Sequence, residues 1–106
     1  MENKVILYDI KREDGDRFYL QAVLFLDGKL ALEGQDFSKI ALELFGDDEY
    51  EYYYMFDVMN TNKLKIALKT DNLLHSLVKF FNGEMINEKF RIFCKESDIE
   101  FDIHVI

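Results

Sequence analysis

A strict alternation of side chains through residues 50–58 is the feature that most limits how this chain can fold. Its repeating positions are Tyr50, Tyr52, Tyr54, Phe56 and Val58. A period of two is that of a β-strand, because successive side chains point to opposite faces of a sheet. The pattern predicts a strand whose aromatic set faces a core, while Glu49, Glu51 and Tyr53 face outward.

Three further strands are predicted ahead of this segment. Residues 5–12 and 18–26 are rich in apolar and aromatic side chains, and a turn cluster at 13–16 separates them. Because residues 18–26 are apolar at both sets of alternating positions, we expect a central strand covered on both faces. Asp27 and Gly28 predict a two-residue type I′ hairpin turn. A third strand then follows over 29–34, with Leu30 and Leu32 inward.

Helical spacing appears over 36–45 and in three segments after residue 60. Asp36 or Ser38 is a candidate cap for the first. For the next two helices, the candidate caps are residues 60–62 and residues 70–71. The last of the helical segments spans 85–95. Alternation over 99–105 then predicts a final strand. The order β-β-β-α-β-α-α-α-β favours an α+β fold, a mainly antiparallel five-stranded sheet with helices packed on one face. With 106 residues, the chain is expected to form one domain over 1–106.

The charge balance narrows the classes of partner. There are 21 acidic and 13 basic residues, a net charge of -8. Such a surface repels phosphate backbones and anionic membranes, so neither nucleic acid nor membrane is an expected partner, whereas a basic protein is. No apolar run approaches the roughly 20 residues that span a bilayer. With its single cysteine and no signal-peptide pattern, the chain is expected in the cytoplasm.

The sequence contains no recognisable catalytic, metal or cofactor motif. The five glycines form no phosphate loop, and no Cys or His pair has metal-ligand spacing. Cys94 beside His75 would be a nucleophile and base, but Cys94 lies on the apolar side of its predicted helix, as a structural thiol does. The acidic turn at 47–49 lacks the length and pattern of a calcium loop. We therefore expect no enzyme, no cofactor and no metal site.

A protein-binding surface is the remaining hypothesis. Its candidate residues are Asp36, Asp47, Asp48, Glu49, Glu51 and Tyr53. A rigid aromatic side chain surrounded by charge is typical of protein-binding patches. The features suit an immunity-type inhibitor that neutralises a basic toxin or enzyme by contact. The alternatives are a structural domain that forms a homodimer through a sheet face or edge, and an enzyme with an unfamiliar site.

Four blocks of the sequence carry a resemblance. They are YDIKREDGD at 8–16, LALEGQD at 30–36, GDDEYEYYYMF at 46–56 and SDIEFDIHV at 97–105. In these blocks the chain resembles a family of small bacterial proteins with no established activity. The resemblance implies a strand-rich first half followed by helices, and it implies no catalytic residue.

Overall fold

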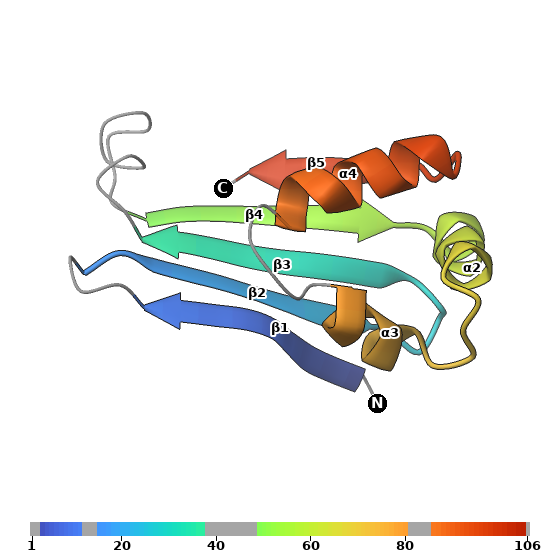
Figure 1. Ribbon diagram of the computed structural model, residues 1–106, viewed down its shortest axis with the longest axis horizontal. Coiled ribbons are helices and arrows are strands. Elements are labelled where there is room, and N and C mark those ends of the chain that lie inside the picture. The colour runs from blue at the N-terminus through green and yellow to red at the C-terminus, as the bar shows by residue number, and fades with distance from the viewer. Residues whose placement is uncertain (1–2, 12–14, 38–48, 81–85, 106) are drawn as a thin grey trace.

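A five-stranded antiparallel sheet forms the frame of the protein, as a computed structural model shows (Figure 1). The structure describes residues 3–11, 15–37, 49–80 and 86–105. The strands are β1 (Asn3–Lys11), β2 (Arg17–Leu24), β3 (Leu30–Phe37), β4 (Glu49–Phe56) and β5 (Asp102–Val105). They lie in the sheet in the order of the chain, and each pairs antiparallel with its neighbours.

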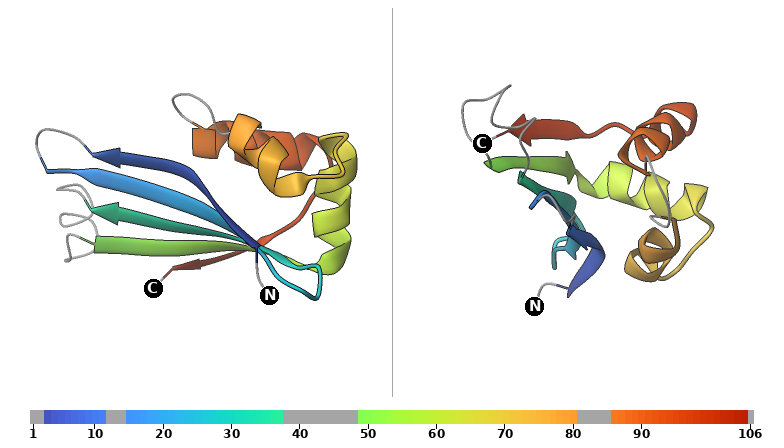
Figure 2. Two further views of the ribbon diagram at one scale, coloured as in Figure 1. Left: turned by 90° about the horizontal axis from the view of Figure 1, so that it is seen from below. Right: turned by 60° about the vertical axis from the view of Figure 1, so that its left-hand side comes forward.

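The three described helices pack against one face of this sheet. They are α2 (Val58–Ala67), α3 (Leu73–Phe80) and α4 (Ile86–Glu96). Figure 2 shows them gathered at one end of the sheet, while the strands continue past them toward the other end. The predicted α+β fold with helices on one face is thus confirmed. The helix predicted over 36–45 lies largely outside the described residues. Its first two positions belong to β3, so Asp36 is a strand residue.

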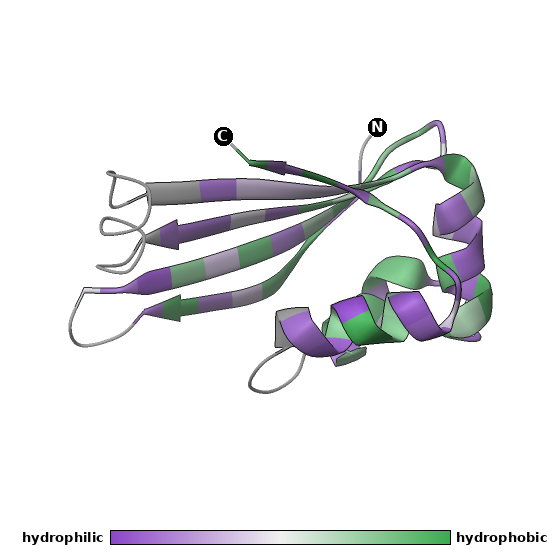
Figure 3. Cartoon of the chain, turned by 90° about the horizontal axis from the view of Figure 1, so that it is seen from above, coloured by the Kyte–Doolittle hydropathy of each residue, from purple (hydrophilic) through white to green (hydrophobic). Residues whose placement is uncertain are grey.

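The core lies between the helices and the near face of the sheet. Its largest fully buried side chains include Leu20, Leu32, Tyr54, Phe56, Leu77 and Phe90. Aromatic rings join the layers, since Phe101 lies 5.0 Å from Tyr54 and 4.9 Å from Phe56, centre to centre. The inward set predicted for residues 50–58 is confirmed at Tyr52, Tyr54 and Phe56, but it was wrong for Val58, which begins α2 and is 41% exposed. Hydrophilic and hydrophobic segments accordingly alternate along the strands in Figure 3.

The hairpin between β2 and β3 forms where the sequence predicted it, but with a different turn. Gly28 has φ +92°, whereas Asp27 is not among the residues with positive φ. The Gly28 amide donates to the Phe25 carbonyl at 3.0 Å, and the Phe25 amide donates to the Lys29 carbonyl at 2.9 Å. This is a three-residue loop that ends in a left-handed glycine, so the type I′ prediction was wrong. β2 is an interior strand, but the described helices cover only one of its faces.

The helix caps also differ from those expected. Asp57 caps α2 by accepting a hydrogen bond from the Asn60 amide at 2.8 Å, and it lies three residues before the first of the predicted caps. Asn72 accepts from the His75 amide at 3.3 Å at the start of α3. Hydrogen bonds from the backbone and side chain of Asn60 lower the pKa of the Asp57 carboxyl. In both helices the cap is a short polar side chain whose oxygen reaches a backbone N–H.

The two edges of the sheet are built differently. β1 carries a register shift between Ile6 and Tyr8, which places Leu7 in the core as an extra residue. β5 pairs regularly with β4 over all its residues, and all of them are exposed.

None of the helices in the described ranges has the length and apolar character that crossing a bilayer requires.

Candidate functional site

The sheet face opposite the helices, called the open face below, holds the strongest candidate surface. Strand pairing fixes which side chains share it, because residues directly opposite one another point to the same side. One row across the sheet runs Ile6, Gln21, Glu33, Tyr53 and His104. The next row holds Tyr19, Gln35 and Glu51. The open face is therefore aromatic and polar, with carboxylates near its centre.

Hydrogen bonds within β2 and between neighbouring strands hold these side chains in place. The Tyr19 hydroxyl donates to Gln21 Oε1 at 3.1 Å, and Gln21 Nε2 donates to Glu33 Oε2 at 2.5 Å. Gln35 Nε2 donates to Glu51 Oε1 at 3.0 Å. Both carboxylates are thus oriented by a neutral amide. The surface is ordered before any ligand arrives.

Tyr53 lies at the centre of this arrangement. Its strand neighbours are Glu33 on β3 and His104 on β5, and its ring is half-buried. Partial burial raises the pKa of the Tyr53 phenol, and the charges of Glu51 and Glu33 raise it further. The hydroxyl therefore stays protonated near neutral pH, and it offers a hydrogen-bond donor within a negative surround.

A basic side chain bounds the face on the β1 side. Arg17 Nε and Nη2 donate to the two carboxylate oxygens of Asp9 at 3.1 and 3.2 Å. The guanidinium carbon also lies 5.7 Å from the centre of the Tyr19 ring, within cation–π range. Because this ion pair is exposed, it contributes little to stability. The pair links β2 to the edge strand β1.

The structure unites only part of the predicted surface. Glu51 and Tyr53 lie together on the open face, as expected. Asp36 pairs with Phe18 and Tyr50 on the helix side of the sheet, so it does not join them. Burial raises the pKa of Asp36 to about 6. Asp47 and Asp48 lie outside the described residues. Glu49 is the first residue of β4, and its side chain lies outside what the structure describes.

Residues of this face that the sequence analysis missed are Tyr19, Gln21, Glu33 and Gln35. Only part of the signal for them was present: a hairpin fixes the register of its strands, but the predicted two-residue turn would have set Leu26 opposite Lys29, one residue away from the observed register. With Leu24 opposite Leu30, counting outward places Gln21 opposite Glu33 and Tyr19 opposite Gln35. The pairing of Glu33 with Tyr53 carries no such signal, since residues 38–48 separate the two strands.

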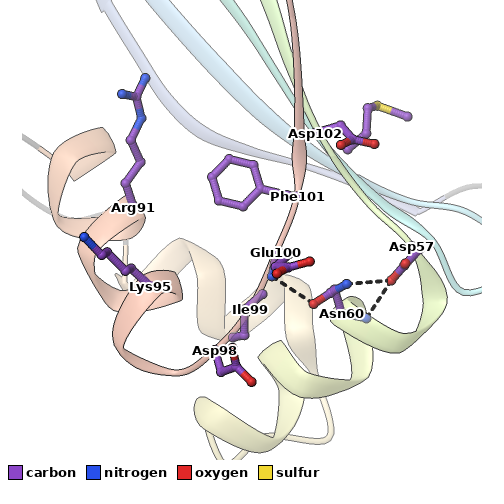
Figure 4. A pocket seen from close by; sticks show the side chains of 10 residues that line it. Asp57, Asn60, Arg91, Lys95, Asp98, Ile99, Glu100, Phe101 and Asp102 are labelled. Atoms are coloured by element: carbon purple, nitrogen blue, oxygen red, sulfur yellow. Dashed lines mark hydrogen bonds between the residues drawn. The ribbon is translucent and has the colours of Figure 1, made fainter.

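A groove at the other end of the molecule is the second candidate (Figure 4). It measures about 540 Å³ between α2, α4 and the segment leading into β5. Arg91 donates to the Tyr54 hydroxyl at 3.0 Å. On the opposite side, Asn60 Oδ1 accepts from the Glu100 amide at 2.9 Å, and Asn60 Nδ2 donates to Asp57 Oδ1 at 3.0 Å. The buried amide of Asn60 thus joins α2 to the segment before β5, which is a structural role.

The remaining candidates for chemistry do not come together into a site. Cys94 is 1% exposed, and burial raises its pKa to about 12, so it remains a thiol. His75 is exposed on α3, and His104 is exposed on β5. In the described part of the chain, no three His, Cys, Asp or Glu side chains gather as metal ligands.

Comparison with known proteins assigns this chain to no family. The chain matches no protein-family model, no curated protein and no solved structure. The resemblance carried by the four sequence blocks accordingly stays a prediction.

Proposed function

We propose that this protein is a small acidic binding module of the cytoplasm that recognises a basic partner protein through its open face. It would act as an immunity-type inhibitor does, neutralising a toxin or enzyme by covering it. The observation that supports the proposal is Tyr53, a half-buried aromatic side chain with Glu33 and Glu51 close enough to raise its pKa. An aromatic anchor within a charged surround is the usual composition of an interface centre and its rim.

Electrostatics favours a basic partner over other ligands. The whole chain carries a net charge of -8, so a basic protein is attracted before contact and oriented during approach. On docking, the carboxylates of Glu33 and Glu51 meet cationic side chains of the partner. A glutamine amide already orients each carboxylate, so less side-chain freedom is lost on binding.

Contact rather than catalysis is the proposed mode of action. Cys94, the only cysteine, is buried as a neutral thiol, and it supplies no nucleophile while the fold is intact. The open face instead offers hydrogen-bond donors and acceptors on a rigid sheet. Such a surface needs no cofactor and no metal to bind a protein.

The test is capture of a partner by two matched variants. The open-face variant carries Glu33→Lys and Glu51→Lys, and the control carries Glu88→Lys and Glu96→Lys on α4. Both change the net charge equally, because each replaces two glutamates by lysines. Purified proteins are immobilised and exposed to lysate of the native cell, and captured proteins are identified by mass.

The proposal expects one basic protein to be retained by the wild type and the α4 variant and to be lost by the open-face variant. Its affinity, measured with the purified partner, should fall on the order of a hundredfold, as the loss of two interface charges allows. Equal loss from both variants would show that net charge alone attracts the partner. Undiminished binding to the open-face variant would overturn the proposed surface.

A further inference from the structure

The two edge strands of the sheet differ in their protection against pairing with another chain. β1 has a bulge and carries Lys4 and Lys11, devices that usually prevent edge-to-edge association. β5 has neither lysine nor proline, and it keeps a regular register with β4. Figure 1 shows β5 as the outermost strand on its side of the sheet. Its outer backbone groups face no other strand that the structure describes.

The side chains of β5 divide between the two faces. Ile103 and Val105 pair with Tyr54 and Tyr52, so they lie on the helix side, yet they are 50% and 53% exposed. Asp102 and His104 pair with Met55 and Tyr53, so they lie on the open face. One side of this edge is therefore apolar, and the other holds an acid and a base two residues apart.

This pattern is self-complementary in one register. A two-fold axis perpendicular to the sheet pairs a strand antiparallel with its own copy and keeps every side chain on its face. If Asp102 or His104 lies on that axis, it faces the same residue of the second copy. If Ile103 lies on the axis, each Asp102 faces His104 of the second copy. The same register sets Ile103 opposite Ile103 and Val105 opposite Phe101.

The geometry points to a homodimer in which β5 pairs with β5 of a second copy about a two-fold axis at Ile103. The sheet then continues through the interface, with five strands from each copy and both sets of helices on the same side. Two Asp102–His104 pairs and a central apolar contact specify the register. This inference goes beyond the inhibitor-type function, because it uses the edge of the sheet and leaves the open face around Tyr53, Glu33 and Glu51 accessible to a partner.

The first test locates the axis by cross-linking. In Ile103→Cys, the two new thiols face each other across the axis, and mild oxidation should yield a covalent dimer. In Val105→Cys, the matched control of similar exposure, the thiols lie about 14 Å apart along the strands and should not join. Cys94 is buried and does not compete. Equal cross-linking of both variants, or of neither, would overturn the proposed register.

The second test exchanges the charges of the interface. His104→Asp places acid opposite acid at both symmetric positions and should weaken dimerisation roughly tenfold. Adding Asp102→His restores acid opposite base and should recover the affinity to within about threefold of the wild type. Analytical ultracentrifugation over a wide concentration range measures both. A wild-type protein that stays monomeric throughout, or a dimer unaffected by His104→Asp, would overturn the inference.

The two proposals fail separately. A monomer that still binds the basic partner would refute only the dimer. If the protein dimerises but the open-face variant binds the partner as well as the wild type does, only the proposed partner surface would be refuted.

Discussion

The ring of Tyr52 on β4 lies across the α-carbon of Gly34, its direct partner on β3. A β-carbon placed on Gly34 would come within 2.1 Å of Tyr52 Cζ and within 2.5 Å of both Cε atoms. No real pair of carbons approaches so closely without bonding, so one of the two residues would have to move. Both are buried, and the Tyr52 hydroxyl lies 3.5 Å from that of Tyr8. The glycine is needed for its missing side chain.

Replacing Gly34 by alanine should therefore destabilise the protein by about 1–3 kcal/mol or more, because the ring must leave a packed position. Urea unfolding followed by circular dichroism measures the loss. The control is the same substitution in a Tyr52→Ala background, where the ring is absent and the added methyl should cost much less. Equal losses in both backgrounds would show that the ring is not the obstacle.

Asp36 should make stability fall as pH rises. The ordinary pKa of its carboxyl is 3.8, and burial raises it to about 6 in the folded chain. Folding therefore favours the protonated carboxyl of Asp36. The stabilisation that results is fully present below about pH 4 and is lost as pH rises through about 6. Asp36→Asn stays neutral, so near pH 7 it should be more stable than the wild type by about 1–3 kcal/mol.

The advantage of Asp36→Asn should largely vanish near pH 4, where the wild-type carboxyl is protonated. Urea unfolding at several pH values checks this. Asp71→Asn, which alters an exposed carboxylate ahead of α3, is the matched control. If Asp36→Asn brought no gain near neutral pH, the carboxylate would have to be solvated in the folded state.

Cys94 should resist thiol reagents until the protein unfolds. Its side chain is 1% exposed, and its pKa is raised to about 12, so both access and ionisation are suppressed. At mildly alkaline pH, its reaction with a disulfide reagent should be more than roughly a hundredfold slower than in urea. Monitoring the released chromophore gives the rate, and a rapid reaction in buffer would contradict the buried position.

Asn60 should contribute more to stability than its neighbour Asn62. Asn60 is 5% exposed and bonds both Asp57 and the Glu100 amide, whereas Asn62 is exposed on the same helix. Asn60→Ala removes both bonds and leaves a backbone N–H without its partner, at a cost of about 1–3 kcal/mol. Asn62→Ala should change stability little. Thermal unfolding compares the two, and similar values for both would refute the bridging role.

Local patterns predicted the fold well, because each strand signal depends on a few adjacent residues. The alternation through Tyr52, Tyr54 and Phe56 identified the inward face, and Gly28 located the hairpin. The turn type was wrong because the same dipeptide fits two- and three-residue loops. The α2 cap was missed because the polar run at 60–62 predicted a later start, whereas the helix begins at Val58, directly after Asp57.

The candidate site was less predictable, because it depends on which strands become neighbours. Glu51 and Tyr53 were found by alternation within β4, whereas Glu33 reaches Tyr53 only through pairing between β3 and β4. Asp36 was grouped with the acidic cluster by proximity in sequence. Strand parity instead places it on the opposite face of the sheet from Tyr53.

The amide of Asn60 makes the last strand depend on the first turn of a helix. One of its ends is bonded three residues back to Asp57, and the other reaches Glu100, which is 40 residues further along the chain. When the start of α2 frays, the segment that leads into β5 loses its anchor. The two should therefore open as one cooperative unit in hydrogen exchange. Opening of β5, at the outer edge of the sheet, would then depend on fraying at the start of α2.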